Sequence, residues 1–194
     1  MRPDAKADRG YLDALAEIAQ RIADSLGERH DGEPVGMYVA GGAAALYYTG
    51  ARTTGDVDAA FSRRVVLPGA LEVAYRDRDG SARQVYLDRN YNESFGLIHE
   101  RAHDDAREIR LAGVDRARLR VFLLSPLDLA VSKLARFAEH DRADILALAR
   151  KGLITAGGLR RRATEALGGY VGDVRPVEVN IDLACALVEQ AGRA

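Results

Sequence analysis

The sequence predicts a protein of the α/β class with a helical C-terminal part, and two observations support this. Up to residue 124, segments with the periodicity of amphipathic helices alternate with short apolar segments typical of strands. From residue 125 onward, helical patterns alone recur. We therefore expect two parts in the 194-residue chain, a core over residues 1–124 and a helical part over residues 125–194 that packs on it.

Composition and charge narrow the classes of partner. The formal net charge of −1 gives no overall basic excess of the kind that favours nucleic-acid binding, so RNA contact would need a local basic patch. No apolar run approaches the ~20 residues that span a bilayer, and the first ten residues are polar, unlike a signal peptide. The single cysteine, Cys185, cannot form an internal disulfide and fits a reducing compartment. We expect a cytoplasmic protein without a membrane partner.

The first elements follow from apolar periodicity and from glycines. Residues 11–29 carry an apolar side chain every three or four positions and predict a helix. Residues 35–40 predict an apolar strand that ends at the pair Gly41-Gly42. A short helix of small residues is expected over 43–48, with Gly50 as its C-cap.

An acidic strand comes next, after a loop over residues 51–55. Residues i and i+2 of a strand point to the same side, so Asp56 and Asp58 share one face while Val57 faces the core. Two adjacent carboxylates repel each other unless a divalent cation bridges them, and Mg²⁺ prefers carboxylate oxygens. Glycines at a helix start let phosphate approach the backbone N–H groups, a role that fits Gly41 and Gly42. Together these features predict chemistry on a nucleoside triphosphate (NTP).

These residues also carry a family resemblance. Gly41-Gly42, thirteen intervening residues and Asp56-Val57-Asp58 resemble the signature of the DNA polymerase β-like nucleotidyltransferase superfamily. The longer segment GGAAALYYTGARTTGDVD is similar to small bacterial nucleotidyltransferases related to AbiEii-type abortive-infection toxins. The resemblance implies the nucleotidyltransferase fold, a small mixed β-sheet flanked by helices. It also implies transfer of a nucleoside monophosphate from an NTP to a hydroxyl, with Mg²⁺ (or Mn²⁺) held by the two acids, two ions being expected.

Further site residues are proposed around the acids. Arg52 and Thr54 match the positions that precede the acid pair in the family, where they would contact phosphate; the alternative is that the loop threonines merely enter the strand. The superfamily places a third acid on a neighbouring strand. A hairpin is predicted over residues 71–87, and Asp88, at the end of its second strand, is the first candidate. Glu72 and Glu108 are the alternatives.

A second block, SPLDLAVSKLARFAEHDRADILALA, resembles the family's helical lysine followed by an acidic stretch. Ser125 predicts the N-cap of a helix whose apolar arc extends to Phe137. By the resemblance, Lys133 and Arg136 would contact the triphosphate, and Asp144 would orient Lys133 or assist at the metal. Lys133 as an ordinary surface lysine is the alternative.

Later helices are expected over residues 155–167 and 179–191, with a link over 168–176.

Two other patterns suggest different chemistry. The sequence HERAH, starting at His99, fits a zinc-binding motif if it is helical, although its internal arginine and the acids after it argue against this. Arginines 116, 118 and 120 and arginines 160–162 form basic clusters that would meet RNA or pair with nearby acids.

The acceptor is the least determined part of the prediction. By analogy with toxin members of the resembled group, we expect the tRNA 3′ end as acceptor and a cognate antitoxin protein as partner, with this chain as the toxin. The first alternative is nucleotidylation of a protein side chain, either as an adenylylating enzyme or as an antitoxin. The second is an inactive nucleotide-binding or regulatory module.

Overall fold

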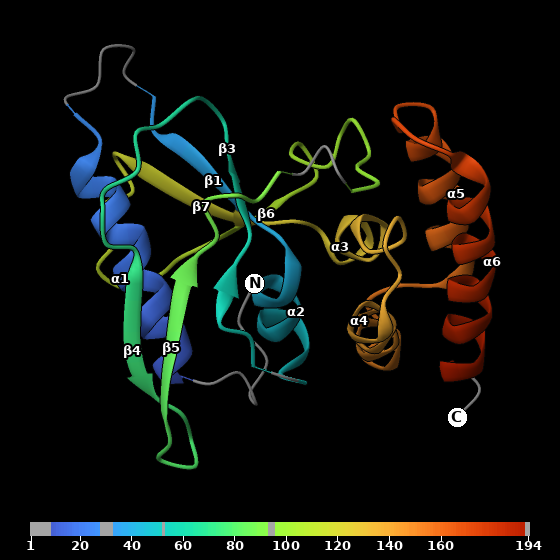
Figure 1. Cartoon of the computed structure of the whole chain (residues 1–194), viewed down its shortest axis with the longest axis horizontal. Coiled ribbons are helices and arrows are strands. Elements are labelled where there is room, and N and C mark those ends of the chain that lie inside the picture. The colour runs from blue at the N-terminus through green and yellow to red at the C-terminus, as the bar shows by residue number, and fades with distance from the viewer. Residues whose placement is uncertain (1–8, 28–32, 52, 93–95, 193–194) are drawn as a thin grey trace. The chain divides into compact units, whose positions relative to one another are not determined.

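A computed structural model of the chain describes residues 9–27, 33–51, 53–92 and 96–192. The chain forms two compact units, each built from separate segments. Unit 1 comprises Met1–Tyr91 and Arg107–Leu123, and unit 2 comprises Asn92–Ala106 and Leu124–Ala194. Figure 1 labels their helices and strands. The predicted division of the chain into a core over residues 1–124 and a helical part over residues 125–194 stays a prediction.

Unit 1 contains two small sheets and two helices among its described residues. Its elements are α1 (Arg9–Ser25), β1 (Val35–Val39), α2 (Gly41–Thr49), β2 (Asp56–Val57), β3 (Ala59–Phe61), β4 (Glu72–Arg76), β5 (Ala82–Leu87), β6 (Arg107–Ile109) and β7 (Leu119–Leu123). One sheet has the order β3-β1-β7-β6, in which β1 and β7 are parallel and the other pairs antiparallel. The other has the order β2-β5-β4, in which β2 and β5 are parallel. Both sheets are mixed, which confirms the predicted α/β class.

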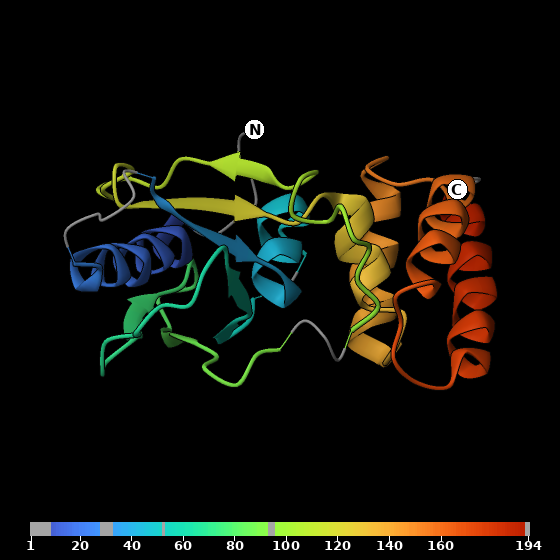
Figure 2. The same ribbon diagram turned by 90° about the horizontal axis from the view of Figure 1, so that it is seen from above.

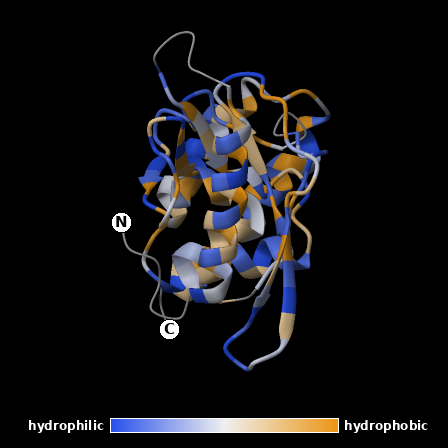
Figure 3. Cartoon of the chain, turned by 90° about the vertical axis from the view of Figure 1, so that its left-hand side faces the viewer, coloured by the Kyte–Doolittle hydropathy of each residue, from blue (hydrophilic) through white to orange (hydrophobic). Residues whose placement is uncertain are grey.

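Helix α1 supplies much of the core of unit 1. It contacts β4 and β5 of one sheet and β7 of the other, and Figure 2 shows it between β7 and β4. Hydrophobic and hydrophilic residues alternate along it (Figure 3), and the Tyr11 ring packs edge-on against Tyr75 of β4. The helix ends at Ser25, earlier than predicted, and the predicted end at residue 29 lies outside the described residues. The Ser25 hydroxyl donates to the carbonyl of Ile22 (2.7 Å), a local bond that competes with helix continuation.

The predicted acidic strand is two short strands that belong to different sheets. Val57 of β2 pairs with Leu87 of β5, whereas Ala59 of β3 pairs with Val39 of β1. The chain changes partner at Asp58, whose carbonyl accepts the N–H of Ala40 (2.8 Å). The residue that changes partner is therefore also the second acid of the predicted site.

Unit 2 is helical, as predicted for the C-terminal part. Its helices are α3 (Pro126–Ser132), α4 (Glu139–Arg150), α5 (Ala156–Leu167) and α6 (Val174–Ala191). Helix α6 packs on α4 and α5, and α3 packs on α4 and α5. Among the described residues, no helix has both the length and the apolar character needed to cross a membrane.

Two helix boundaries in unit 2 differ from the prediction. Helix α6 begins at Val174, five residues early, because the Asp173 side chain caps it and a proline is tolerated in the first turn. Helix α3 ends at Ser132 instead of continuing to Phe137. Phe137 has a left-handed backbone (φ 49°), which a continuous α-helix does not allow.

Candidate active site

The two acids stand at the point where the chain passes between the sheets of unit 1. Val57, between them, is fully buried, while Asp56 and Asp58 are half-buried. Their half-buried state follows from the alternation along the strand, since the side chain that faces the core is the apolar one. The acids are therefore anchored by a buried neighbour and keep access to solvent.

Gly41 makes room for Asp58. A Cβ atom built at Gly41 would lie 1.8 Å from Oδ2 and 2.7 Å from Cγ of Asp58, far inside any real contact. Gly41 also has a positive φ of 56°, which side chains rarely adopt. It is the first residue of α2, so the Asp58 carboxylate lies beside the positive end of the helix dipole. The N-cap residue of this helix, Ala40, supplies no side-chain hydrogen bond to its start.

Gly42 makes room for Thr54 in the same way. A Cβ atom at Gly42 would lie 2.9 Å from both Cβ and Oγ1 of Thr54. The Thr54 hydroxyl donates a hydrogen bond to Oδ1 of Asp56. Each glycine of the pair is thus matched to one acid, Gly41 directly and Gly42 through the threonine. The proposed phosphate contact of Arg52 falls on a residue outside those that the structure describes.

The candidates for a third acid lie in three different settings. Asp88 follows β5, donates its N–H to the carbonyl of Val57 (3.0 Å), and by the parallel register comes beside Asp58. Its Oδ1 accepts the N–H of Asn90 (2.8 Å). Glu72 accepts a hydrogen bond from Gln84 across the hairpin (2.9 Å). Of the three, only Asp88 adjoins the acid pair through the sheet register.

Glu108 instead belongs to a cluster with two arginines. It lies on β6 and accepts bonds from Arg116 (2.5 Å) and Arg120 (2.6 Å). These hydrogen bonds, first from Arg120 and then from Arg116, lower the pKa of Glu108 to about 2. An acid on β6 thus neutralises part of the predicted basic row, arginines 116, 118 and 120, which leads into β7. Pairing with nearby acids was the alternative that the sequence left open.

The described residues contain no group of three or more His, Cys, Asp or Glu side chains placed to hold a metal ion. The acid pair still suits Mg²⁺, because this ion commonly binds one or two carboxylates and completes its shell with water and substrate phosphates. Asp56 and Asp58 supply the two carboxylates. A Zn²⁺ site at His99 is not supported, because residues 100–105 form turns rather than an α-helix.

In unit 2, Lys133 lies in a buried ion-pair cluster. Its side chain is 5% exposed, and Nζ lies 2.8 Å from Oδ2 of Asp144 and 3.5 Å from Oδ1 of Asp141. Both acids lie on α4, one turn apart, as their spacing predicts. The alternative of an ordinary surface lysine is therefore wrong, since the ammonium group is buried among carboxylates.

Asp141 also holds Arg136 and the start of α4. Arg136 donates to Asp141 from Nε (2.9 Å) and Nη2 (3.0 Å), and the N–H of Ala138 donates to Oδ2 (3.0 Å). Burial alone would raise the pKa of Asp141. The Arg136 hydrogen bonds and the Lys133 charge outweigh it and hold that pKa below its ordinary value. Arg136 itself stays largely exposed.

Sequence reasoning missed several contacts that depend on tertiary structure. Arg162, placed in a basic cluster, donates to Asp128 (2.7 Å) and Asp105 (2.6 Å). Arg160 pairs with Asp182 (2.6 Å), so this cluster too is compensated by acids. Tyr86, beside Asp56 in the β2–β5 register, was also overlooked. The sequence signal for Tyr86 was its place in the alternating pattern of residues 82–87, which puts it on the face opposite Val85 and Leu87.

A glycine pair that opens a helix, with Gly41 against Asp58 and Gly42 against Thr54, is the arrangement that the resemblance to nucleotidyltransferases leads us to expect. A sequence profile of one family matches residues 13–171, which is most of the chain. The chain belongs to this family, described as "Nucleotidyltransferase of unknown function (DUF6036)", and is an enzyme of the nucleotidyltransferase class. Searches of curated proteins and of solved structures found no significant match.

Proposed function

We propose that the protein transfers a nucleoside monophosphate from an NTP to a hydroxyl acceptor in a reaction that depends on Mg²⁺. The observation that carries the proposal is the pairing of each glycine with one acid. Gly41 admits the Asp58 carboxylate, and Gly42 admits the threonine that donates to Asp56. These contacts hold the Asp58 carboxylate at the start of α2, where backbone N–H groups favour phosphate, and orient the Asp56 carboxylate through Thr54.

In the proposed reaction, the acceptor oxygen forms a bond to the α-phosphorus of the NTP. The bond between this phosphorus and the bridging oxygen to the β-phosphate breaks, pyrophosphate leaves, and the hydroxyl proton passes to water. Asp56 and Asp58 would hold Mg²⁺, two carboxylates being enough for this ion, and Asp88 would lie beside them in the sheet register. The bound ion would supply charge stabilisation for the attacking and leaving oxygens. Thr54 would fix the orientation of Asp56, and the N-terminus of α2 would bind the phosphates.

The resemblance to AbiEii-type enzymes supports three further parts of the proposal. Lys133 and Arg136 would contact the triphosphate, with Asp144 orienting Lys133 through their 2.8 Å ion pair. The acceptor would be the 3′ end of tRNA, and the enzyme the toxin of a toxin–antitoxin pair. The reaction would take place in the cytoplasm, to which the buried free thiol of Cys185 is suited.

The test is a labelling reaction with Mg²⁺, each of the four α-³²P-labelled NTPs in turn, and RNA plus protein from a bacterial extract. We expect label in the tRNA band with wild type and none with Asp56→Asn. Asp104→Asn, which changes an exposed aspartate in a turn, is the matched control and should label as wild type does. Label in a protein band would replace RNA by a protein acceptor. Equal labelling by wild type and Asp56→Asn would refute the site, and no labelling would favour a binding module.

A further inference from the structure

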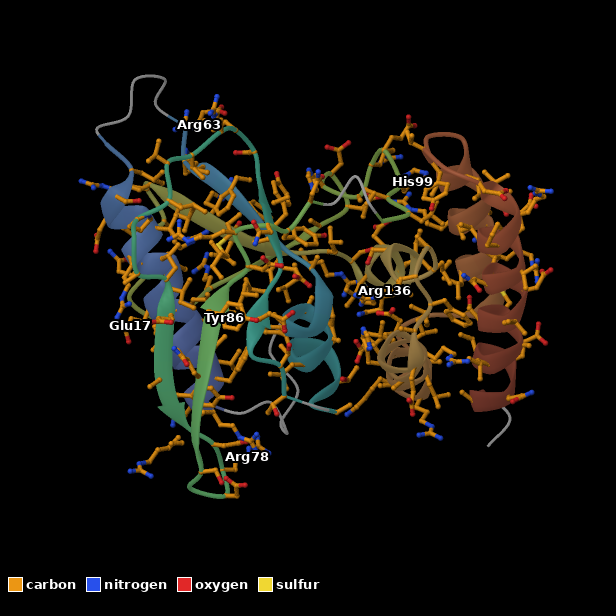
Figure 4. The ribbon with its side chains drawn as sticks, in the orientation of Figure 1. Glu17, Arg63, Arg78, Tyr86, His99 and Arg136 are labelled. Carbon is orange, nitrogen blue, oxygen red and sulfur yellow. The ribbon has the colours of Figure 1, made fainter. Side chains whose placement is uncertain are left out.

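Tyr86 is an exposed aromatic residue directly beside the acid pair. Large hydrophobic side chains are exposed at five described positions, and Tyr86, at 48%, is the aromatic one among them. It lies on β5 (Figure 4). There it is the register partner of Asp56 in β2. Paired residues of neighbouring strands project on the same face, so Tyr86 shares the face of Asp56. The opposite face of this strand is occupied by the buried Val85 and Leu87.

Tyr86 lies beside the backbone of Gly55. Its N–H donates to the carbonyl of Gly55 (2.8 Å), and its ring atom Cε1 is 3.8 Å from the position of a Cβ at Gly55. Gly55 has no side chain, so one side of the ring rests near bare backbone at the entry to the acidic strand. An exposed aromatic ring held in this way suits stacking with another planar group, and nucleobases are such groups.

The position of Tyr86 relative to the glycine pair indicates whether it contacts the base of the NTP or the base of the acceptor. Gly41 and α2 adjoin the acids on the side of Asp58, where the carbonyl of Asp58 accepts the N–H of Ala40 from the end of β1. Tyr86 adjoins them from the other neighbouring strand, β5. If the triphosphate binds at α2, the group on the β5 side of the acids is the acceptor.

The charges around Tyr86 favour a base over a phosphate. Glu72 on β4 is its cross-strand partner, Asp56 is its partner on β2, and Asp88 follows two residues later. Three acids around one ring disfavour a phosphate, whereas stacking with an uncharged base does not oppose their charge. Stacking also accepts any base, because every base has a π-face.

We propose that Tyr86 stacks on the terminal nucleobase of an RNA acceptor and so positions its 3′ hydroxyl at the acids. This inference rests on the proposed function. It also narrows that function, because the acceptor must then be a nucleoside rather than an amino-acid side chain. Tyr86 acts here as a positioning residue for the acceptor.

The test measures binding without turnover. A short single-stranded RNA that ends in a 3′ 2-aminopurine nucleoside is titrated with the full chain, Mg²⁺ being present and NTP omitted. Stacking quenches 2-aminopurine fluorescence, so we expect quenching with wild type and with Tyr86→Phe. Tyr86→Ala should lose the quenching and bind the RNA about tenfold more weakly, the usual size of one base–aromatic stack.

Two controls separate the acceptor from the NTP. Gln84→Ala removes the next exposed side chain on the same face of β5 and should bind the RNA as wild type does. Binding of a fluorescent NTP analogue should be unchanged in Tyr86→Ala. Equal RNA quenching and affinity in wild type and Tyr86→Ala would overturn the proposal, as would a loss confined to NTP binding.

The failures of the two proposals are distinguishable. If wild type labels an acceptor in an Asp56-dependent way but Tyr86→Ala retains the same RNA affinity, the proposed function stands and the role of Tyr86 is refuted. If no transfer occurs but Tyr86 still quenches the terminal base, RNA binding stands and nucleotidyl transfer is refuted.

Discussion

The carboxylate of Asp58 occupies the space that a side chain at Gly41 would fill, with Oδ2 1.8 Å from the position of the missing Cβ. Gly41 is also the first residue of α2, where a glycine lets a substrate phosphate approach the backbone N–H groups. Here it is required by a protein group first, because any larger residue would displace the acid before substrate enters. The first glycine and the second acid of the motif are therefore one steric unit.

Gly41→Ala should abolish transfer through this steric conflict. The new methyl group forces the Asp58 carboxylate to move, and misplacement of a reacting group by about 1 Å costs roughly 100-fold in rate. The positive φ adds a strain of about 1–2 kcal/mol. The initial rate of label transfer and the unfolding midpoint measure the two effects separately.

Gly80→Ala is the matched control. Gly80 also has a positive φ, 83°, but a Cβ there would meet nothing within 4 Å. It should share the loss of stability and keep the activity. Equal loss of activity in both variants would mean that backbone strain, and not the displacement of Asp58, explains the effect.

Thr54→Val should weaken metal binding while keeping the shape of the site. Valine retains the methyl contact with Gly42 but lacks the hydroxyl that donates to Asp56. Groups that orient a metal-binding carboxylate typically contribute 10–100-fold to metal affinity or activity. We expect a loss in this range for Mn²⁺ affinity, measured by calorimetry, and recovery with Thr54→Ser. The control is Thr53→Val, at the exposed neighbouring residue, and this variant should bind Mn²⁺ as wild type does. An equal loss of Mn²⁺ affinity in Thr53→Val would point to a general effect on the loop.

The pattern along the chain predicted local features of the site better than contacts across it. The glycine pair, the alternation of Asp56 and Asp58 about Val57, and the shared face of Asp141 and Asp144 are set by spacing, so periodicity finds them. The division of the acidic strand between two sheets depends on which backbone groups meet, which no short window contains. The same holds for the burial of Lys133, whose sequence neighbours resemble those of a surface residue.

Lys133→Met should destabilise the chain strongly. The ammonium group lies 2.8 Å from Asp144 and 3.5 Å from Asp141, and its loss removes a positive charge from beside two buried carboxylates. Breaking one side of a buried ion pair typically costs about 3–5 kcal/mol. Denaturant unfolding should show this loss, and adding Asp144→Asn should restore part of it. Lys151→Met, at an exposed helix end, serves as the control. Unchanged stability in Lys133→Met would contradict the buried cluster.

Nucleotide affinity separates a substrate role of Lys133 from this structural one. Under conditions where the variants are folded, we expect Lys133→Met to bind the NTP more weakly than wild type. The Lys133→Met, Asp144→Asn double variant should remain weak although its stability has partly recovered. If affinity recovers together with stability, Lys133 acts on the fold and not on the triphosphate.

The Asp141 carboxylate should make the stability of unit 2 depend on pH, with a loss of stability at acid pH. Its pKa in the folded chain lies below the ordinary value near 3.8, because the Arg136 hydrogen bonds and the Lys133 charge outweigh the effect of burial. A folded-state pKa below the unfolded one means that the unfolded chain takes up the proton first as the pH falls. The stabilisation is therefore complete above about pH 5, and it declines as the pH falls below the unfolded pKa and through the folded one.

Comparison with Asp141→Asn isolates this contribution from that of the other carboxylates. The variant lacks the charge that Lys133 and Arg136 contact, so it should unfold at lower denaturant concentration than wild type at pH 7. The difference between the two unfolding midpoints should shrink between pH 5 and pH 3, because wild-type Asp141 then loses its advantage by protonation. Asp104→Asn should show no such change. A difference that stays constant with pH would mean that Asp141 stabilises the chain through packing and not through its charge.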